Sequence, residues 1–310
     1  MNKPLLVLVG PTAVGKTDLS LQLAKTLDGE IISADSMQIY RYMDIGTAKP
    51  SPQERQGIPH HLIDVCHPRE SFSVAQYQEL ATEAIADCHR RGKLPILTGG
   101  TGLYIQAVVD GFNIPSAPAN PALRQELEEL ARREGVEKVH RMLAEVDPER
   151  AAQLHPNNLR RVIRAIEVYQ ATGQRMGELE KMAGQNRPAY RLYMYGLTRE
   201  RAELYARINR RVDVMLEAGL IDEVRSILDM GVPADATAMQ GLGYKEIVGY
   251  LLGEYSLDEA IYMLKRDTRR YAKRQGTWFR RDTRLHWFNL TSTTAATVIA
   301  QICQRLANSQ

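Results

Sequence analysis

The 310-residue sequence predicts an α/β protein built on a doubly wound parallel sheet. Short apolar runs, typical of buried parallel strands, alternate with helical stretches in the first third of the chain. Strands that alternate with helices in this way favour an open parallel sheet covered on both faces. We expect strands at Leu5–Val9, Ile31–Ala34, His61–Val65, Leu94–Thr98 and Leu192–Leu197, and early helices at Lys16–Leu27 and Val74–Arg91.

The middle and the end of the chain are expected to be mainly helical. The proline-rich segment Asn113–Pro121 is typical of a linker, and charge-rich helical sequence then continues to Met182. Gly184–Pro188 is a second break, after which a strand pattern returns. We therefore predict a sheet core formed by residues 1–112 and 189–310, a mainly helical inserted domain at 113–188, and a helical, basic C-terminal region.

The composition is that of a soluble globular protein, with 44% apolar and 25% charged residues. The cysteines Cys66, Cys88 and Cys303 lack disulfide or zinc spacing, so we expect a reducing, cytoplasmic environment. The N-terminal apolar run is too short for a signal peptide. No window approaches the ~20 apolar residues that cross a bilayer, so no membrane association is expected.

A glycine-rich loop directly follows the first expected strand and matches G-x-x-x-x-G-K-[ST] at every fixed position. Such a loop turns backbone N–H groups toward phosphate oxygens, and the next helix adds its dipole. Lys16 would reach the terminal phosphate, and the Thr17 hydroxyl could bind Mg²⁺. We predict a phosphate-binding loop (P-loop) made of Gly10, Pro11, Thr12, Ala13, Val14, Gly15, Lys16 and Thr17.

The P-loop motif indicates a phosphorylated ligand without fixing the reaction. Kinases, ATPases and transferases with a diphosphate leaving group could all use it, and a purely structural glycine turn is the remaining alternative. The fold class predicted is therefore a P-loop doubly wound parallel sheet with an inserted helical domain and a helical C-terminal region.

Asp35 lies just past the second expected strand. In an open α/β sheet, ligands bind beyond the carboxyl ends of the strands, so this carboxylate should face the ligand of the P-loop. It could act as a general base, hold Mg²⁺ through water, or cap the next helix. All three roles fit its position.

A basic segment near the C-terminus is the main candidate for contact with nucleic acid. Nine Lys or Arg residues and two acidic residues lie between Lys265 and Arg284, a local excess of +7 in a chain of net charge +3. A phosphate-backbone track and a solvated helix face are both compatible with this pattern. The residues expected on one half of the helix are Lys265, Arg266, Arg269, Arg270, Lys273 and Arg274. A second cluster, Arg160, Arg161 and Arg164, has the same two interpretations.

The chain resembles the tRNA dimethylallyltransferase family over essentially its whole length. The segment Leu8–Lys49 carries the first part of the resemblance, including the P-loop and Asp35. The later matching segments, in order, are His60–Asp64, Thr98–Tyr104, Asn158–Arg161, Arg207–Val212, Gly241–Lys245 and Arg274–Trp278.

This resemblance implies transfer of a dimethylallyl group from dimethylallyl diphosphate to the exocyclic N6 of the adenine next to the anticodon (position 37) of tRNA. The adenine would be flipped out of its stack, as base-modifying enzymes require. By similarity, Asp35 is the base, and Thr101 binds near the amine and the diphosphate. Lys16 and Thr17 with Mg²⁺ would stabilise the departing diphosphate, and Arg207 and Arg211 would clamp it, without the resemblance ranking these two arginines.

The same resemblance implies a set of tRNA contacts around the anticodon stem-loop. Residues 35–38 would lie beside the target base. The implied contacts are Asp35, Ser36, Met37, Gln38, Thr101, Asn158, Leu159, Arg160, Arg161, Gly243, Tyr244, Lys245, Lys273 and Arg274. No protein partner is implied, and a monomer is expected.

A zinc or other structural metal site is not expected. His60 and His61 are adjacent, and on a strand they would point to opposite faces. Eukaryotic relatives in the resembled family carry a C-terminal zinc finger, but no C-x₂-C…H pattern occurs here. Three alternatives to the main hypothesis remain: a P-loop small-molecule kinase, an adenylate prenyltransferase of the cytokinin type, and a non-catalytic RNA-binding module.

Overall fold

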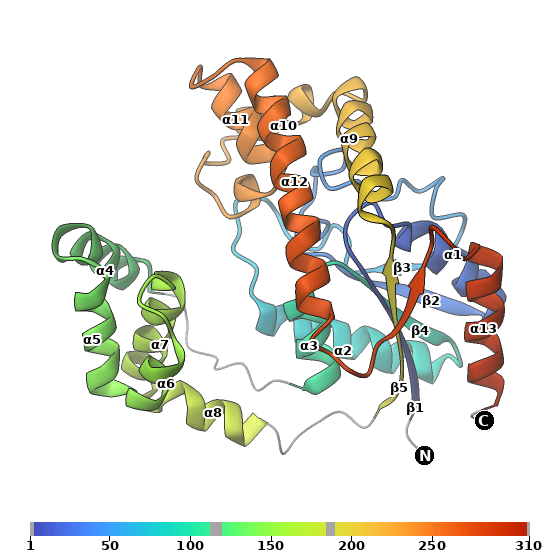
Figure 1. Ribbon diagram of the computed structural model, residues 1–310, viewed down its shortest axis with the longest axis horizontal. Coiled ribbons are helices and arrows are strands. Elements are labelled where there is room, and N and C mark those ends of the chain that lie inside the picture. Colours follow the sequence, from blue (N-terminus) through green and yellow to red (C-terminus); the bar gives the residue numbers. More distant parts are fainter. Residues whose placement is uncertain (1–2, 112–119, 184–189, 309–310) are drawn as a thin grey trace. The chain divides into compact units, whose positions relative to one another are not determined.

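The chain forms two units in the computed structural model, which describes residues 3–111, 120–183 and 190–308 (Figure 1). Unit 1 comprises Met1–Gln106 and Ala189–Gln310, and unit 2 comprises Ala107–Pro188. Most of the linker predicted at Asn113–Pro121, and the break at Gly184–Pro188, lie outside the described residues.

A six-stranded sheet with the order β3-β2-β4-β1-β5-β6 forms the centre of unit 1, and every neighbouring pair is parallel. Residues 5–9 of the central strand β1 and all residues of β2 are buried, because helices and loops cover both faces of the sheet. This confirms the predicted fold class. The strands are β1 Lys3–Val9, β2 Gly29–Ala34, β3 His60–His61, β4 Leu94–Gly99, β5 Tyr190–Thr198 and β6 His286–Asn289.

Two strand predictions need correction. The strand expected at His61–Val65 is reduced to the two residues of β3, because Leu62 and Asp64 adopt φ of +63° and +61°, which no strand allows. The edge strand β6, which pairs with β5, lies in a region expected to be helical. Four residues with polar ends are too short to carry a clear strand pattern.

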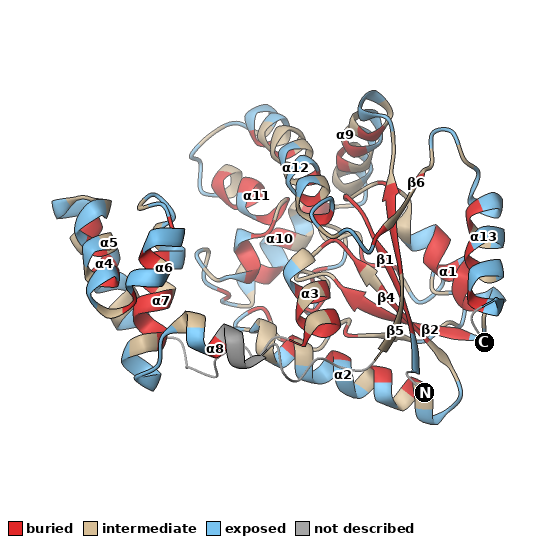
Figure 2. Cartoon of the chain, turned by 60° about the horizontal axis from the view of Figure 1, so that its bottom comes forward, coloured by how far each residue is buried: buried red, intermediate tan, exposed pale blue. Residues whose placement is uncertain are grey.

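Helices α1 and α2 pack against this sheet, and the buried side of each helix of unit 1 is turned inward, as the burial colours of Figure 2 show. Ser73 and Ser256 form capping boxes that fix the starts of the two long helices α2 and α12. No helix in the described ranges is both long and apolar enough to span a bilayer. The helices are α1 Lys16–Thr26, α2 Val74–Arg90, α3 Gly102–Asp110, α9 Arg201–Glu217, α10 Leu220–Asp229, α11 Tyr244–Leu251, α12 Leu257–Phe279 and α13 Ala295–Ala307, with the 3₁₀ turn η1 Ala238–Gln240.

Two apolar clusters stand out among the described residues of unit 1. One lies between the sheet, α1 and α13 and includes Leu6, Leu8 and Val298. The other joins α9–α12 to the loop after β2, with Ile39, Tyr40 and Met43 packed against helix residues such as Tyr244. The loop that follows Asp35 is therefore anchored to helices from the C-terminal third of the chain.

Unit 2 is helical throughout its described secondary structure. Its helices α4–α7 share an apolar cluster that includes Leu127, Leu143 and Ile163. Glu167 is buried beneath this cluster and accepts hydrogen bonds from Arg124, Arg164 and the backbone of Asn120. The helices are α4 Pro121–Glu134, α5 Val136–Val146, α6 Pro148–Gln153, α7 Leu159–Thr172 and α8 Met176–Ala183.

Candidate active site

A cavity of about 890 Å³ opens in unit 1 at the carboxyl ends of β1, β2 and β4. This is the edge of a parallel sheet where ligands of open α/β folds bind. Its walls come from the P-loop, from the loop after β2 and from helices α9 and α12. Nine of the predicted site residues line it: Thr12, Ala13, Gly15, Lys16, Thr17, Asp35, Gln38, Arg207 and Arg211.

The P-loop has the tight backbone that its glycines predict. Gly10 and Gly15 have φ of +154° and +112°, and a Cβ on Gly10 would lie 2.7 Å from the carbonyl oxygen of Leu197. Val14 is fully buried in the apolar cluster beside the sheet, and Pro11 is also buried. The side chain of Val14 is therefore unavailable to a phosphate, and Pro11, which has no backbone N–H, can only shape the loop.

Lys16 folds back over the P-loop and donates from Nζ to the carbonyl oxygens of Gly10 and Pro11, each at 2.9 Å. Burial, opposed by the charge of Asp35 and aided by the cation of Arg211, lowers the pKa of Lys16 to about 8. A bound anion would provide a negative counter-charge close to this ammonium and so favour its protonated form. The site is thus prepared for a strongly anionic ligand.

Side chains from distant parts of the chain hold the P-loop from outside. The Nε groups of Arg207 and Arg199 donate to the carbonyl oxygens of Ala13 and Val14, at 2.8 and 2.9 Å. The P-loop geometry therefore depends on α9 and on the end of β5, not on its glycines alone.

Arg207 and Arg211 lie one turn apart on α9, and both line the cavity. The pKa of Arg211 is lowered by burial, raised by the charge of Asp35 and lowered again by Arg207. Together with Lys16, these arginines give the cavity a concentration of positive charge suited to phosphate groups.

Asp35 follows β2 directly, and its carboxylate is held by the backbone that comes after it. Oδ1 accepts hydrogen bonds from the N–H groups of Met37 at 2.9 Å and Gln38 at 3.4 Å. These bonds close a turn over residues 36–39, and the next described element is β3, so Asp35 does not cap a helix, which was one of the three roles considered. Oδ2 has no hydrogen-bond partner among the residues that the structure describes, so one oxygen stays available to a ligand in the cavity.

Thr101, after β4, links the ends of two strands. Its Oγ1 accepts from the backbone N–H of Ser36 at 3.0 Å and lies 3.2 Å from the Ser36 hydroxyl, while its own N–H donates to the carbonyl of Ala34 at 3.1 Å. Thr101 therefore fixes the backbone beside Asp35.

Two residues of α12 at this site were not predicted. Gln275 is buried and bridges the two phosphate-facing loops: its Oε1 accepts from the N–H of Thr12, and its Nε2 donates to the carbonyl of Gly100, each at 2.9 Å. Tyr271, one turn earlier, lines the cavity. Burial and the charge of Asp35 raise the pKa of Tyr271 to about 12, so its hydroxyl stays protonated at neutral pH. In the sequence, the signal that could have identified Tyr271 and Gln275 is their i, i+4 spacing, which places both on the helix face opposite the basic residues.

The predicted tRNA contacts divide into exposed and buried residues. Lys245, Lys273 and Arg274 are exposed in unit 1, and Asn158, Arg160 and Arg161 are exposed at the start of α7 in unit 2, where Leu159 is half-buried. Ser36, Met37 and Gln38 are half-buried beside Asp35. Gly243 and Tyr244, in contrast, are buried.

For Tyr244 the structure corrects the expectation of a direct contact with tRNA. Its side chain is fully buried, and its hydroxyl donates to Glu223 at 2.6 Å. Tyr244 packs beneath the loop that follows Asp35 and cannot reach a ligand outside the protein from there.

The basic residues of α12 are also not equivalent. Lys265 forms an ion pair with Asp213 at 2.5 Å, and Arg266 and Arg270 both bind Asp267. Lys273 and Arg274 are exposed and have no acidic partner within 4 Å in the described part of the chain. The free positive charge of this helix is therefore concentrated toward its C-terminal half.

The residues at the cavity fit a hard divalent cation. The Thr17 hydroxyl is exposed at the P-loop and has no hydrogen-bond partner among the described residues, and Asp35 presents a free carboxylate oxygen. Hydroxyl and carboxylate oxygens are the ligands that Mg²⁺ prefers, usually together with substrate phosphates.

A second group of ligand-type side chains, Glu30, His61 and Cys88, lies on the other side of β3. Their ligand atoms are within 4.8 Å of one another. Both oxygens of Glu30 already bind the guanidinium of Arg91, which holds the pKa of Glu30 at about 2, and His61 binds the same carboxylate at 2.7 Å. The charge is compensated without a metal, so this group fastens β2 to α2 and β3. His60 lines the cavity instead, so the two histidines point apart.

Comparison with known proteins adds sequence and structural similarity to this geometry. A protein-family model described as IPP transferase matches residues 38–282. A tRNA dimethylallyltransferase from Alkaliphilus oremlandii is 56% identical over 292 residues, which cover 94% of this chain and 93% of that protein. One from Carboxydothermus hydrogenoformans is 54% identical over 289 residues, or 93% of each chain.

Solved structures agree. The full-length tRNA isopentenylpyrophosphate transferase from Bacillus halodurans has a TM-score of 0.74 and 50% identity, covering 99% of this chain and 96% of that one. A eukaryotic dimethylallyltransferase acting on tRNA has a TM-score of 0.82 and 29% identity, covering 99% of this chain and 80% of that one.

Proposed function

Because the chain belongs to the IPP transferase family, we propose that it transfers a dimethylallyl group from dimethylallyl diphosphate to N6 of the adenine next to the anticodon (position 37) of tRNA. The products are isopentenyladenosine in tRNA and diphosphate. The observation that carries this proposal is the shared cavity, into which both a complete P-loop and the free Oδ2 of Asp35 open.

The leaving group determines most of the site. The diphosphate binds at the P-loop, where Lys16 moves its ammonium from the carbonyl oxygens of Gly10 and Pro11 to the phosphate oxygens. Arg207 and Arg211 neutralise the charge that develops as the allylic C–O bond breaks. Mg²⁺, bound by Thr17 and the diphosphate, would supply further charge neutralisation.

The acceptor is a weak nucleophile, so alignment and proton removal matter. The N6 lone pair forms the new C–N bond to the allylic carbon, the C–O bond breaks with its electron pair on diphosphate, and one N6 proton passes to Oδ2 of Asp35. Thr101 and the N–H groups of Met37 and Gln38 keep that carboxylate in place. Holding both reactants in line supplies a large part of the rate.

The tRNA must present its adenine outside the base stack to reach a cavity at the strand ends. Residues 35–38 lie beside it, and the exposed cations Lys273, Arg274 and Lys245 in unit 1, with Arg160 and Arg161 in unit 2, bind the phosphate backbone. We further propose that the protein acts as a monomer in a reducing cytoplasm, in keeping with its unpaired Cys66, Cys88 and Cys303.

The test is to incubate the protein with dimethylallyl diphosphate, Mg²⁺ and either unmodified tRNA or AMP, and to analyse the nucleosides by mass spectrometry. We expect prenylated adenosine from the tRNA reaction only. Prenylated AMP would instead support an adenylate prenyltransferase, and no prenylated product from either acceptor would refute the proposal.

A further inference from the structure

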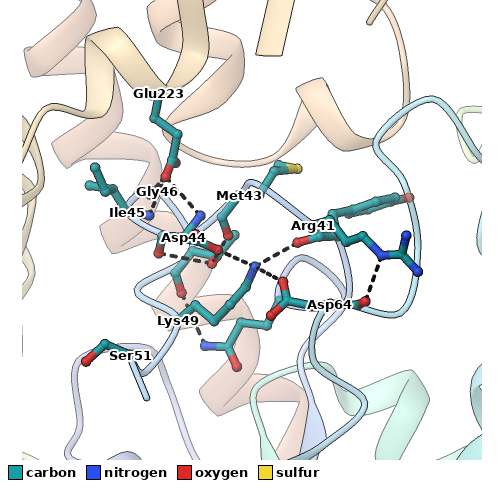
Figure 3. Close-up of polar contacts among 12 residues, drawn as sticks. Arg41, Met43, Asp44, Ile45, Gly46, Lys49, Ser51, Asp64 and Glu223 are labelled. Carbon is teal, nitrogen blue, oxygen red and sulfur yellow. Dashed lines mark hydrogen bonds and ion pairs between the residues drawn. The ribbon is translucent and has the colours of Figure 1, made fainter. Parts of the chain in front are cut away.

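The carboxylate of Glu223, in the first turn of α10, organises a turn in the loop after β2 (Figure 3). Its Oε2 accepts from the N–H groups of Asp44 at 2.9 Å and Ile45 at 2.7 Å, and its Oε1 accepts from the N–H of Gly46 at 3.0 Å. Three consecutive amides thus converge on one side chain that is 177 or more residues away in the sequence. Hydrogen bonds to a charged acceptor are among the stronger ones in proteins.

This turn, residues 43–49, forms part of the cavity wall through Thr47, Ala48 and Lys49. It is closed internally by the bond from the N–H of Ala48 to the carbonyl of Ile45, at 3.0 Å. The Nζ of Lys49 fastens its far end to Asp64 at 2.7 Å (Figure 3). Glu223 therefore fixes a segment whose other side faces the ligand.

The 43–49 turn also orients the side chain of Gln38, which lines the same cavity. The Nε2 of Gln38 donates to the carbonyls of Thr47 and Ala48 at 3.3 and 3.4 Å, and its Oε1 accepts from the hydroxyl of Ser33 at 3.1 Å. These contacts decide which end of the amide points to the turn and which to the strand. An amide facing a base can discriminate only if its donor and acceptor ends are fixed.

Tyr244 completes the arrangement from below. Its hydroxyl donates to Oε1 of Glu223 at 2.6 Å. A Cβ added to Gly46 would lie 2.6–2.9 Å from the ring and hydroxyl of Tyr244, so only a glycine fits there. Burial and the neighbouring charge of Glu223 raise the pKa of Tyr244, which keeps this donor protonated. Glu223 accepts all four of these hydrogen bonds, and among side chains of this length only a carboxylate has two acceptor oxygens.

We propose that Glu223 is a positioning residue for transfer to the adenine: by holding the 43–49 turn, it sets the orientation of Gln38 beside Asp35. This inference rests on the proposed function, because it assigns Gln38 to the adenine side of the cavity. The proposal gives the P-loop and the 43–49 turn separate supports. The P-loop is held by Arg207 of α9 and Gln275 of α12, and the turn by Glu223.

The test compares Glu223→Gln with wild type in steady-state transfer to tRNA. The amide keeps the shape of the carboxylate, but its NH₂ faces donors where an acceptor is needed. We expect kcat to fall ~10–100-fold, because a displacement of about 1 Å costs that much in an aligned site, with KM for dimethylallyl diphosphate unchanged. The matched control is Asp222→Asn, which removes the same charge from the preceding residue of α10; among the described residues, the ion-pair partner of Asp222 is Arg225.

A double-mutant cycle with Gln38→Ala tests the path. If Glu223 acts through Gln38, Glu223→Gln adds little to the loss already caused by Gln38→Ala; independent, additive losses would overturn the proposal. Should Glu223→Gln fail to fold, Tyr244→Phe, which deletes a single donor to Glu223, must show a smaller fall in kcat with KM for the diphosphate still unchanged. Wild-type transfer by the Glu223 variant overturns this inference alone, whereas an inactive wild type overturns the proposed function with it.

Discussion

The backbone N–H of Thr12 donates to the side-chain oxygen of Gln275 at 2.9 Å, across 263 residues of sequence. Through its Nε2, the same buried amide holds the carbonyl of Gly100. The basic helix α12 is thereby joined to the P-loop and to the loop after β4 by one side chain. This amide sets the spacing between the two loops, which our proposal places at the diphosphate and at the amine.

Replacing Gln275 with Leu should lower stability. The substitution keeps a similar volume but leaves the N–H of Thr12 and the carbonyl of Gly100 without their partner. Each unsatisfied buried group costs ~1–3 kcal/mol, so for two groups we expect a loss of ~2–6 kcal/mol in the free energy of unfolding, measured by urea denaturation. An unchanged midpoint would show that solvent satisfies both groups.

Replacing Asp35 with Asn should affect the chemical step and spare tRNA binding. Asn can still accept at Oδ1 the hydrogen bonds that Met37 and Gln38 donate, so the loop should keep its shape. Loss of a positioned base lowers kcat ~10²–10⁴-fold. Single-turnover kinetics and tRNA binding by filter retention separate the two effects. Near-normal turnover would remove Asp35 from the base role.

Affinity for dimethylallyl diphosphate should fall above about pH 8. In the free protein the pKa of Lys16 is lowered to about 8, so at higher pH the ammonium is neutral and must take up a proton when the diphosphate binds. Linkage then weakens binding by up to ~10-fold per pH unit until the raised pKa of the complex is reached. Calorimetric titration in two buffers of different ionisation enthalpy would count this proton.

A Lys16→Arg variant is the control for that titration, because its guanidinium stays charged throughout the range. Its affinity should be weaker than that of wild type but flat with pH. A wild-type affinity that is constant up to about pH 9.5, where linkage predicts a clear decline, would contradict the proposed ionisation of Lys16.

Much of unit 1 follows from local patterns in the sequence. The apolar run of β1, the P-loop spacing and the position of Asp35 after β2 place the cavity because parallel strands end at one edge. The contacts that hold this cavity do not follow. Gln275 and Glu223 accept hydrogen bonds from backbone groups more than 170 residues away, and the sequence around each does not predict which groups these are.

Two of the predictions failed for different physical reasons. Leu62 and Asp64 lie in the segment predicted as the strand His61–Val65, yet both adopt a positive φ, which this segment's apolar pattern does not predict. Tyr244 was expected at the tRNA from the family resemblance of Gly241–Lys245, but its ring fills the space over Gly46. For Tyr244, packing against a turn distant in the sequence decided the position of the side chain.

Binding of tRNA should depend strongly on salt, and on α12 the dependence should reside in its C-terminal half. Each phosphate contact contributes about 0.7–0.9 to the slope of log K against log salt. Lys273→Ala combined with Arg274→Ala should therefore reduce the slope by ~1.4–1.8. Lys265→Ala is the matched control, since Asp213 already neutralises that lysine, and its slope should stay near that of wild type. Equal effects from the two variants would contradict the assignment.

The central claim is that the P-loop holds a departing diphosphate and not a nucleoside triphosphate that gives up its phosphate. One reaction decides this: the protein with unmodified tRNA, Mg²⁺, carbon-labelled dimethylallyl diphosphate and ATP labelled in its terminal phosphate, followed by counting both labels in the recovered tRNA and small molecules. Our account predicts carbon label in tRNA in a one-to-one ratio with released diphosphate, and no phosphate transfer from ATP. Phosphate label on any acceptor, with no carbon label in tRNA, would contradict it.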